Sequence, residues 1–219
     1  MKEINWFTEA QIEEALEASK TTLRPIFIDF WSPGCKGCAK MDAVSYEDDS
    51  VIRFLYERFI CIKYNTKSPN TYLKKLTGHA PLLWSPTFVV LDYHLSEMRR
   101  IVGYLPPEEL LAELTISEGL IELLHTNAHG AYLKFESVID DFSETHAAPE
   151  ALYWLGVAAF RRNGRSLKAL IPKWQAIYDR YPQSVWWTKA DVSDTKIPLS
   201  PFQRPGRNDS ILIENLIGD

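Results

Sequence analysis

A short apolar run that leads directly into a cysteine pair constrains the fold of this chain more than any other feature. Residues 26–31 are rich in β-branched and aromatic side chains, which is typical of a strand covered on both faces. Ser32-Pro33-Gly34 predicts a tight turn after this strand, and a helix is expected to begin at about Cys35. The cysteines of the Cys35-Lys36-Gly37-Cys38 segment therefore fall where a buried strand gives way to a helix.

The rest of the first half predicts alternating helices and strands. Thr8-Glu9-Ala10-Gln11 has the pattern of a capping box for a helix that runs to about Lys20, and Asp48 can cap a later helix. Apolar residues predict strands at 59–64, 86–92 and 97–104, the last two forming a hairpin. Further helices are expected to begin at Ser68-Pro69 and at Pro106-Pro107. The predicted order is helix, strand, helix, helix, strand, helix, strand, strand, helix.

From about Leu120 the pattern indicates helices alone, with a faint internal repeat. Phe135-x-x-Val138 matches Trp174-x-x-Ile177, and Pro149-x-x-Leu152 matches Pro182-x-x-Val185. A period of between 30 and 40 residues resembles stacked helical hairpins of the tetratricopeptide type. The predicted organisation is an α/β domain at 1–118, helical hairpins at 119–190 and an irregular tail at 191–219 that contains Pro198, Pro201 and Pro205.

Charge and hydropathy exclude several classes of function. The net charge of −5 and the absence of a dense run of Lys or Arg argue against nucleic acid as a partner. No apolar stretch approaches the roughly 18 residues that a membrane-spanning helix needs. The first residues, Met1 to Trp6, lack the apolar core of a signal peptide. A cytoplasmic location is therefore expected, unless a longer precursor was trimmed.

In a reducing compartment a C-x-x-C pair has two main uses, redox exchange and metal binding. The N-terminus of a helix stabilises a thiolate at Cys35, and Lys36 adds positive charge beside it. Cys38, one turn further along, can then attack a mixed disulfide. A structural zinc site needs four ligands, and beyond the pair the chain offers only Cys61 and five scattered histidines. No metal is expected, although two unreactive thiols remain an alternative.

The segment from Asp29 to Cys38 resembles the strand, turn and active-site helix of the thioredoxin superfamily. Ser85-Pro86-Thr87 is similar to the cis-proline loop of that family, and Gly103-Tyr104 resembles the end of its last strand. Tyr46 to Ile60 looks like the helical insertion of some bacterial members. The resemblance covers about residues 5–116. It implies an α/β thioredoxin fold, a central mixed sheet flanked by helices, followed here by an all-α helical-hairpin region.

The resemblance also implies roles for individual residues. Asp29 aligns with the family's buried aspartate, the proton acceptor for the second cysteine, and Lys63 with the lysine that accompanies it. Cys35 would be the nucleophile and Cys38 the resolving thiol. The peptide bond before Pro86 is expected to be cis. The substrate-binding set implied by the resemblance comprises Trp31, Gly34, Lys36, Gly37, Trp84, Ser85 and Pro86.

Three positions depart from the family pattern. Gly34 stands where the family usually has tryptophan, Gly37 replaces the proline between the cysteines, and Ala43 replaces a helix-kinking proline. These departures leave exchange chemistry possible and bear on its redox potential and electron donor.

The expected function is a cytosolic thiol-disulfide oxidoreductase that works as a reductant through Cys35 and Cys38, with no other cofactor. Its partners would be protein disulfides and a reducing protein such as a thioredoxin reductase. The alternative is a non-enzymatic adaptor, in which the helical region binds a protein partner and the α/β domain is a scaffold, because a fold alone does not fix a function.

Overall fold

The computed structural model describes residues 3–68, 72, 76–77 and 80–191. Within these residues a mixed sheet has the strand order β1-β3-β2-β4-β5. The central strand β2 runs parallel to β3 and antiparallel to β4. The strands are β1 (Trp6–Phe7), β2 (Ile26–Trp31), β3 (Ile60–Asn65), β4 (Thr87–Leu91) and β5 (Glu97–Val102). The predicted strands are present, and β1, only two residues long, was not predicted.

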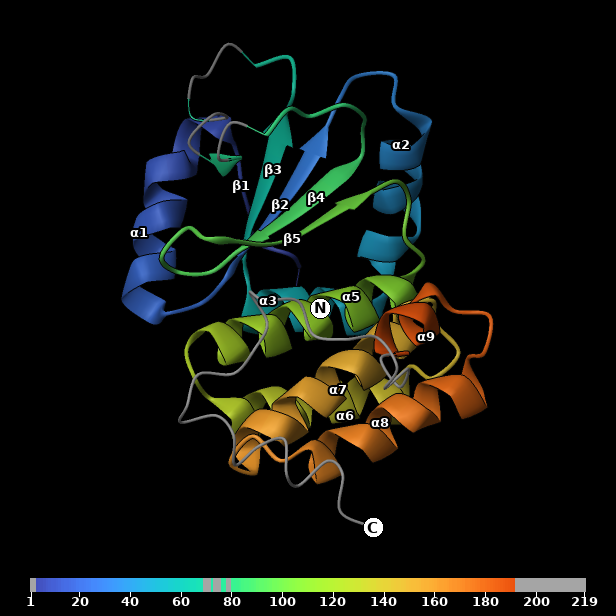
Figure 1. Ribbon diagram of the computed structural model, residues 1–219. Helices are drawn as coiled ribbons and strands as arrows, with labels where there is room; N and C mark the ends of the chain where they lie inside the picture. Colours follow the sequence, from blue (N-terminus) through green and yellow to red (C-terminus); the bar gives the residue numbers. More distant parts are fainter. Residues whose placement is uncertain (1–2, 69–71, 73–75, 78–79, 192–219) are drawn as a thin grey trace.

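The alternation of side chains along β2 builds a separate core on each face of the sheet. Ile26, Ile28 and Phe30 face α1 (Ile12–Thr22) in one cluster. Phe27 faces the opposite side, where the cluster includes residues of α2 (Lys36–Ala43), α3 (Asp49–Arg58) and α5 (Pro107–Leu124). Figure 1 shows α1 on one side of the sheet and α2 on the other. A strand buried on both faces explains the continuous apolar run in the sequence.

The helix boundaries follow the predicted caps closely. The backbone N–H of Thr8 donates to Gln11 Oε1 at 3.3 Å, and a short 3-10 turn leads into α1. The carboxylate of Asp48 accepts from the backbone N–H groups of Ser50 and Val51 at the start of α3. The helix predicted to begin at Ser68-Pro69 lies largely outside the described residues, as does all of the predicted tail beyond Asp191.

The second half consists of α6 (Ala128–Asp141), α7 (Ala148–Arg162), α8 (Leu167–Arg180) and α9 (Val185–Ala190). Helix α5 lies between the sheet and these helices (Figure 1). Its Leu110 and Leu114 pack in the core beneath the sheet, whereas Ala112 and Ile116 belong to the core of the helical region. The boundary predicted between residues 118 and 119 falls inside α5, which continues without a break to Leu124. No helix among the described residues combines the length and apolar character needed to cross a membrane.

The internal repeat seen in the sequence corresponds to two successive helix pairs. Phe142 and Tyr181 are equivalent in the repeat, and each is the C-cap residue of its helix, α6 or α8. The two equivalent turns also touch, because the Tyr181 hydroxyl donates to the Ser143 carbonyl oxygen at 2.7 Å. The similarity to tetratricopeptide units remains a prediction.

A largely buried ion-pair network joins the edge of the sheet to the helical region. The Arg99 guanidinium on β5 donates to both carboxylate oxygens of Glu150 on α7, at 2.8 and 2.9 Å, and also to Glu113 on α5. The three side chains are only 12–13% exposed. Trp154 Nε1 donates to the same Glu150 at 3.1 Å. These contacts connect β5 and α5, which follow each other in the sequence, to the distant helix α7.

Replacement of Arg99 by alanine leaves Glu113 and Glu150 buried without their cation, so we expect a loss of about 3–5 kcal/mol in the free energy of unfolding. Urea denaturation measures it. The control is Arg58→Ala, which breaks a more exposed pair with Glu118 and is expected to cost less than about 1 kcal/mol. Equal losses in the two variants would contradict the role given to the network.

Candidate functional site

Cys35 and Cys38 form a disulfide at the start of α2. Cys35 is the N-cap residue of this helix, and its Sγ accepts a hydrogen bond of 3.0 Å from the backbone N–H of Cys38. Cys35 is partly exposed, whereas Cys38 is 4% exposed. One sulfur can therefore meet a partner from solvent, and the other lies behind it.

The backbone of the turn before Cys35 requires a glycine. Gly34 has φ +79°, a conformation that L-residues with a side chain rarely adopt. A Cβ atom at Gly34 would meet no atom within 4 Å, so packing does not impose the glycine. The Cys35 backbone N–H donates to the Ser32 carbonyl at 3.2 Å and closes the turn. Gly34, where the thioredoxin superfamily usually has tryptophan, therefore lies in a turn whose backbone disfavours any side chain.

Gly37 is needed for a different reason, the close approach of the Pro86 ring. A Cβ atom on Gly37 would lie 2.8 Å from Pro86 Cδ, closer than real contacts allow. The Ser85–Pro86 peptide bond is cis, and the Pro86 carbonyl accepts a bond of 2.9 Å from Gly103 N–H. The glycine between the cysteines thus lets the Ser85–Pro86 loop rest on the first turn of α2.

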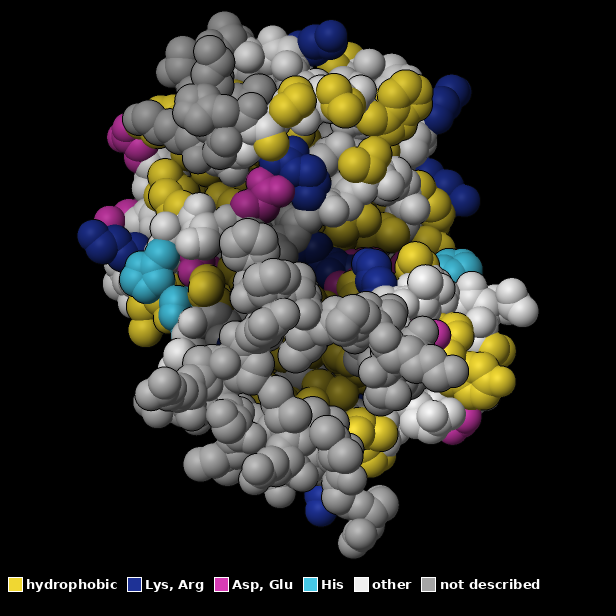
Figure 2. Space-filling model, viewed as in Figure 1, with side chains coloured by type: hydrophobic (Ala, Val, Ile, Leu, Met, Phe, Trp, Pro, Cys, Tyr) yellow, Lys and Arg dark blue, Asp and Glu magenta, His cyan; other side chains and the backbone are white. Residues whose placement is uncertain are grey.

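An open groove of about 440 Å³ runs beside the disulfide. Six of the seven predicted substrate-binding residues line it, whereas Trp31, which is half-buried, does not. Trp84 is 70% exposed at its rim, next to Leu83, which is 85% exposed. Figure 2 shows hydrophobic side chains gathered at the top of the molecule, over the loops at this end of the sheet. The groove is lined by Ser32, Pro33, Gly34, Cys35, Lys36, Gly37, Trp84, Ser85, Pro86, Gly103 and Tyr104.

Asp29 lies on β2 in an almost fully buried position, with 1% of its surface exposed. Its Oδ2 accepts a hydrogen bond of 3.1 Å from the Tyr46 hydroxyl and lies 4.0 Å from Lys63 Nζ. Its Oδ1 has no partner among the described residues. Burial raises the pKa of Asp29 to about 7, although Lys63 and Tyr46 oppose this shift. A carboxyl group with this pKa can gain or lose a proton near neutral pH.

Lys63 is shared between two carboxylates. Besides Asp29, its Nζ pairs closely with Oδ1 of Asp42, a largely exposed residue four positions after Cys38 on α2. Neither Asp42 nor Tyr46 was predicted to belong to the site. The spacing of Asp42 from Cys38, which places both on one helix face, is a usable sequence signal. Nothing in the sequence marks Tyr46, whose contact with Asp29 arises from the packing of the segment after α2.

The other candidate ligands and nucleophiles lie apart from the groove. Cys61 is buried within β3, and burial raises the pKa of its thiol far above the ordinary value. His125 is the C-cap residue of α5, with its Nε2 3.2 Å from Asp92 Oδ2, and His129 lies on α6. Among the described residues no group of three or more His, Cys, Asp or Glu is placed to hold a metal.

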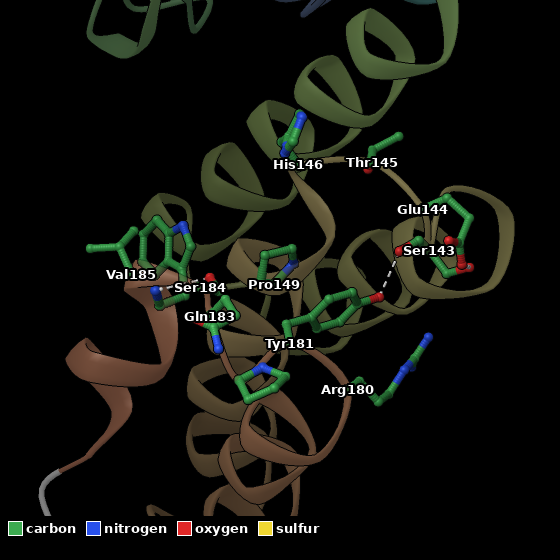
Figure 3. Close-up of a pocket in the computed structure, with 12 residues that line it drawn as sticks. Ser143, Glu144, Thr145, His146, Pro149, Arg180, Tyr181, Gln183, Ser184 and Val185 are labelled. Carbon is green, nitrogen blue, oxygen red and sulfur yellow. Dashed lines mark hydrogen bonds between the residues drawn. The ribbon is translucent and has the colours of Figure 1, made fainter.

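A second cavity, of about 840 Å³, lies in the helical region between the α6–α7 and α8–α9 turns. Figure 3 shows Tyr181 reaching across it toward Ser143, with His146 and Val185 on the surrounding elements. No cysteine lines this cavity. Disulfide chemistry therefore belongs to the smaller groove beside Cys35.

Comparison with known proteins supports the assignment of the first domain. Residues 12–116 match the family model of the thioredoxin-like domain. This range contains strands β2–β5, helices α1–α3 and the first part of α5, and it includes both cysteines of the pair. The chain therefore contains a thioredoxin-like domain with the thioredoxin fold, and the helical region after residue 116 lies outside the match.

Several solved structures are similar at low sequence identity. A thioredoxin from Thermus thermophilus is 24% identical, with a TM-score of 0.43 over 57% of this chain and 89% of that one. The oxidised C-terminal domain of DsbD from Neisseria meningitidis is 16% identical, with a TM-score of 0.40 over 50% and 93%. A disulphide isomerase from Xylella fastidiosa is 18% identical, with a TM-score of 0.37 over 53% and 87%. No curated protein sequence matches the chain.

The raised pKa of Asp29 predicts a pH-dependent effect of Asp29→Asn on stability. The folded state favours the protonated carboxyl, so this residue's contribution to stability is complete below pH 4 and is lost as the pH rises through about 7. We therefore expect Asp29→Asn to raise the free energy of unfolding by on the order of 4 kcal/mol at pH 8 and to change it little at pH 4. Urea denaturation at both pH values measures the difference. An exposed control, Asp141→Asn, should change stability by less than about 0.5 kcal/mol at either pH, and a pH-independent effect of Asp29→Asn would refute the assignment.

The contact between Gly37 and Pro86 predicts that Gly37→Ala displaces the Ser85–Pro86 loop. We expect a loss of about 1–3 kcal/mol from overpacking and a shifted amide resonance of Thr87 in a two-dimensional NMR spectrum. Gly34→Ala is the matched control, because its new methyl group meets open space and only the backbone conformation is strained. An unmoved Thr87 resonance in Gly37→Ala would show that the loop does not depend on this glycine.

Proposed function

We propose that this protein is a thiol-disulfide oxidoreductase that reduces disulfides in other proteins. One observation carries the proposal: the Cys35–Cys38 disulfide lies at the N-terminus of α2, with Cys35 open to a groove and Cys38 buried behind it. The thioredoxin-like family match over residues 12–116 supports the same kind of chemistry.

The reaction begins with the reduced pair. The N-terminal end of α2 and the nearby Lys36 stabilise a thiolate on Cys35. This thiolate attacks one sulfur of the substrate disulfide, forming a bond between Cys35 Sγ and that sulfur. The other substrate sulfur leaves as a thiolate and takes a proton from solvent.

The second step releases the substrate. Cys38 loses its proton to Asp29 and attacks Cys35 Sγ, which breaks the mixed disulfide. The second substrate sulfur leaves as a thiolate and takes a proton from solvent, and Asp29 returns its proton to solvent. Two electrons have then passed from the cysteine pair to the substrate, and the pair is left as the disulfide observed in the structure. Asp29 suits this role because a pKa of about 7 lets it accept a proton at neutral pH and release it again.

The groove provides a place for an extended substrate strand. The backbone of Ser85, before Pro86, would pair with the substrate next to its disulfide, and exposed Trp84 would contact apolar side chains. An external dithiol protein, such as a thioredoxin reductase, would restore the reduced pair. We place the protein in the cytoplasm, where a reductant of this kind has donors, and the cysteine pair needs no further cofactor.

A second candidate function is that of an adaptor. The helical region has its own core, formed by residues of α5 to α9, and lies beyond the family match. In this alternative, the helices bind a partner and the thioredoxin-like domain serves as a scaffold. Turnover of a disulfide substrate distinguishes the two functions.

The proposed oxidoreductase mechanism predicts different outcomes for the serine variants of Cys35 and Cys38. With dithiothreitol as donor, wild-type protein should accelerate the reduction of insulin, and Cys35→Ser should lose at least about 100-fold of this rate because the attacking sulfur is gone. Cys38→Ser should instead accumulate a mixed disulfide with insulin, visible on a non-reducing gel. Cys61→Ala, which changes a buried thiol outside the groove, should retain activity. An inert wild-type protein would favour the adaptor.

A further inference from the structure

The charge of the helical region is distributed very unevenly. Residues 151–178 contain five of the chain's 24 Lys and Arg residues and none of its 29 Asp and Glu residues. The five cations are Arg161, Arg162, Arg165, Lys168 and Lys173. They lie at the end of α7, in the α7–α8 turn and on the first half of α8. We call them the basic surface; it is positive in a chain whose net charge is −5.

Within the part of the chain that the structure describes, no carboxylate forms an ion pair with any of these five residues. Arg161 instead donates to the Leu123 carbonyl at 3.1 Å, and Arg162 lies over the Tyr132 ring at 4.2 Å. The nearby Glu122 accepts a hydrogen bond from the Asn127 side chain at 2.7 Å. The positive charge of this surface is therefore not neutralised by adjacent carboxylates.

A cavity of about 550 Å³ opens within the basic surface. Arg161 and Arg165 line it together with apolar Leu123, Ala128 and Phe160, and with Thr126 from the turn between α5 and α6. A site of this composition can take an apolar side chain while its guanidinium groups meet carboxylates on either side. Arg165 and Lys168 are both exposed and can meet a partner directly.

Because a partly apolar cavity opens within the basic surface, we propose that this surface is a docking site for an acidic protein segment. This segment carries an apolar side chain between its carboxylates. Charge complementarity selects the partner, and the cavity receives the apolar side chain. A long nucleic acid or an anionic membrane fits less well, because the rest of the chain is strongly acidic and would repel an extended anionic surface. In Figure 1 the start of α2, which carries the cysteine pair, lies at the upper end of the sheet, whereas α7 and α8 lie below the sheet.

The test is fluorescence anisotropy with the labelled peptide Glu-Asp-Phe-Glu-Glu-Leu-Asp and the full chain. We expect saturable binding that weakens when salt is raised from about 50 to about 300 mM. The peptide with Gln and Asn in place of Glu and Asp should bind at least about ten-fold more weakly, since it has lost its charges. Failure of the acidic peptide to bind, or equal binding of the neutral peptide, overturns the proposal.

Two charge-reversal variants locate the site. Arg165→Glu with Lys168→Glu should weaken binding of the acidic peptide by at least about ten-fold. Lys20→Glu with Arg53→Glu makes the same change in net charge on exposed positions of α1 and α3 and should alter binding by less than about two-fold. Equal losses in the two double variants would show a general charge effect and overturn the proposal.

Further measurements keep the outcome decisive. If circular dichroism shows that the Glu variant is misfolded, Arg165→Gln with Lys168→Gln replaces it, with the same direction of effect expected. A labelled DNA duplex and vesicles containing phosphatidylserine are titrated in parallel, and tighter binding of either than of the peptide refutes an acidic protein segment as the preferred partner. Insulin reduction should be unchanged in the double variant, because neither residue lines the redox groove.

Discussion

The arrangement of the whole molecule depends on the burial of one helix, α5. It is the last helix of the thioredoxin-like domain and also the first helix of the helical region. Because neighbouring positions on a helix point in different directions, Leu110 and Leu114 reach the core under the sheet while Ala112 and Ile116 reach the core shared with α6 and α7. Neither core would be complete without α5, so the two parts of the chain fold around a common element.

The close packing of α5 against α6 leaves little room for a larger side chain at their contact. A Cβ atom on Gly119 would lie 2.5 Å from Cε1 of Phe135 on α6, so this glycine brings the two helices together. The Arg99 network adds a second connection, from β5 through Glu113 of α5 to Glu150 of α7. A shared helix and a largely buried ion-pair network together fix the orientation of the helical region relative to the sheet.

The redox site follows from the central position of β2. This strand carries Asp29 in its buried part, and the turn that follows it delivers Cys35 to the start of α2. The adjacent strand β4 begins directly after Pro86, which therefore meets Gly37 from the opposite side of the groove. Lys63 comes from β3, in register with Asp29. Asp29, Cys35, Lys63 and Pro86 are thus each placed by β2 or by a strand next to it.

The features that the sequence predicts are those determined by residues that are close together in the chain. The buried strand at 26–31, the glycine-containing turn and the cysteine pair are each marked by neighbouring residues, and the structure places them as expected. The continuity of α5 was missed because its apolar residues surround the helix, so its pattern does not reveal that it serves two cores. Asp42 and Tyr46 were missed because their contacts with Lys63 and Asp29 join segments that only the folded chain brings together.

The difference between local sequence features and contacts made by folding also explains how a basic surface arises in an acidic chain. Its five cations lie at intervals along residues 161–173, and they form no dense run that would mark a binding site. Folding concentrates them, because the α7–α8 turn brings the end of one helix beside the start of the next and Tyr132 of α6 lies against both Arg162 and Lys173. Since α5 and the Arg99 network hold the helical region in a fixed orientation, a partner docked on this surface would keep a fixed position relative to Cys35. Selection of a partner and reaction with its disulfide can then be controlled by different residues of one molecule.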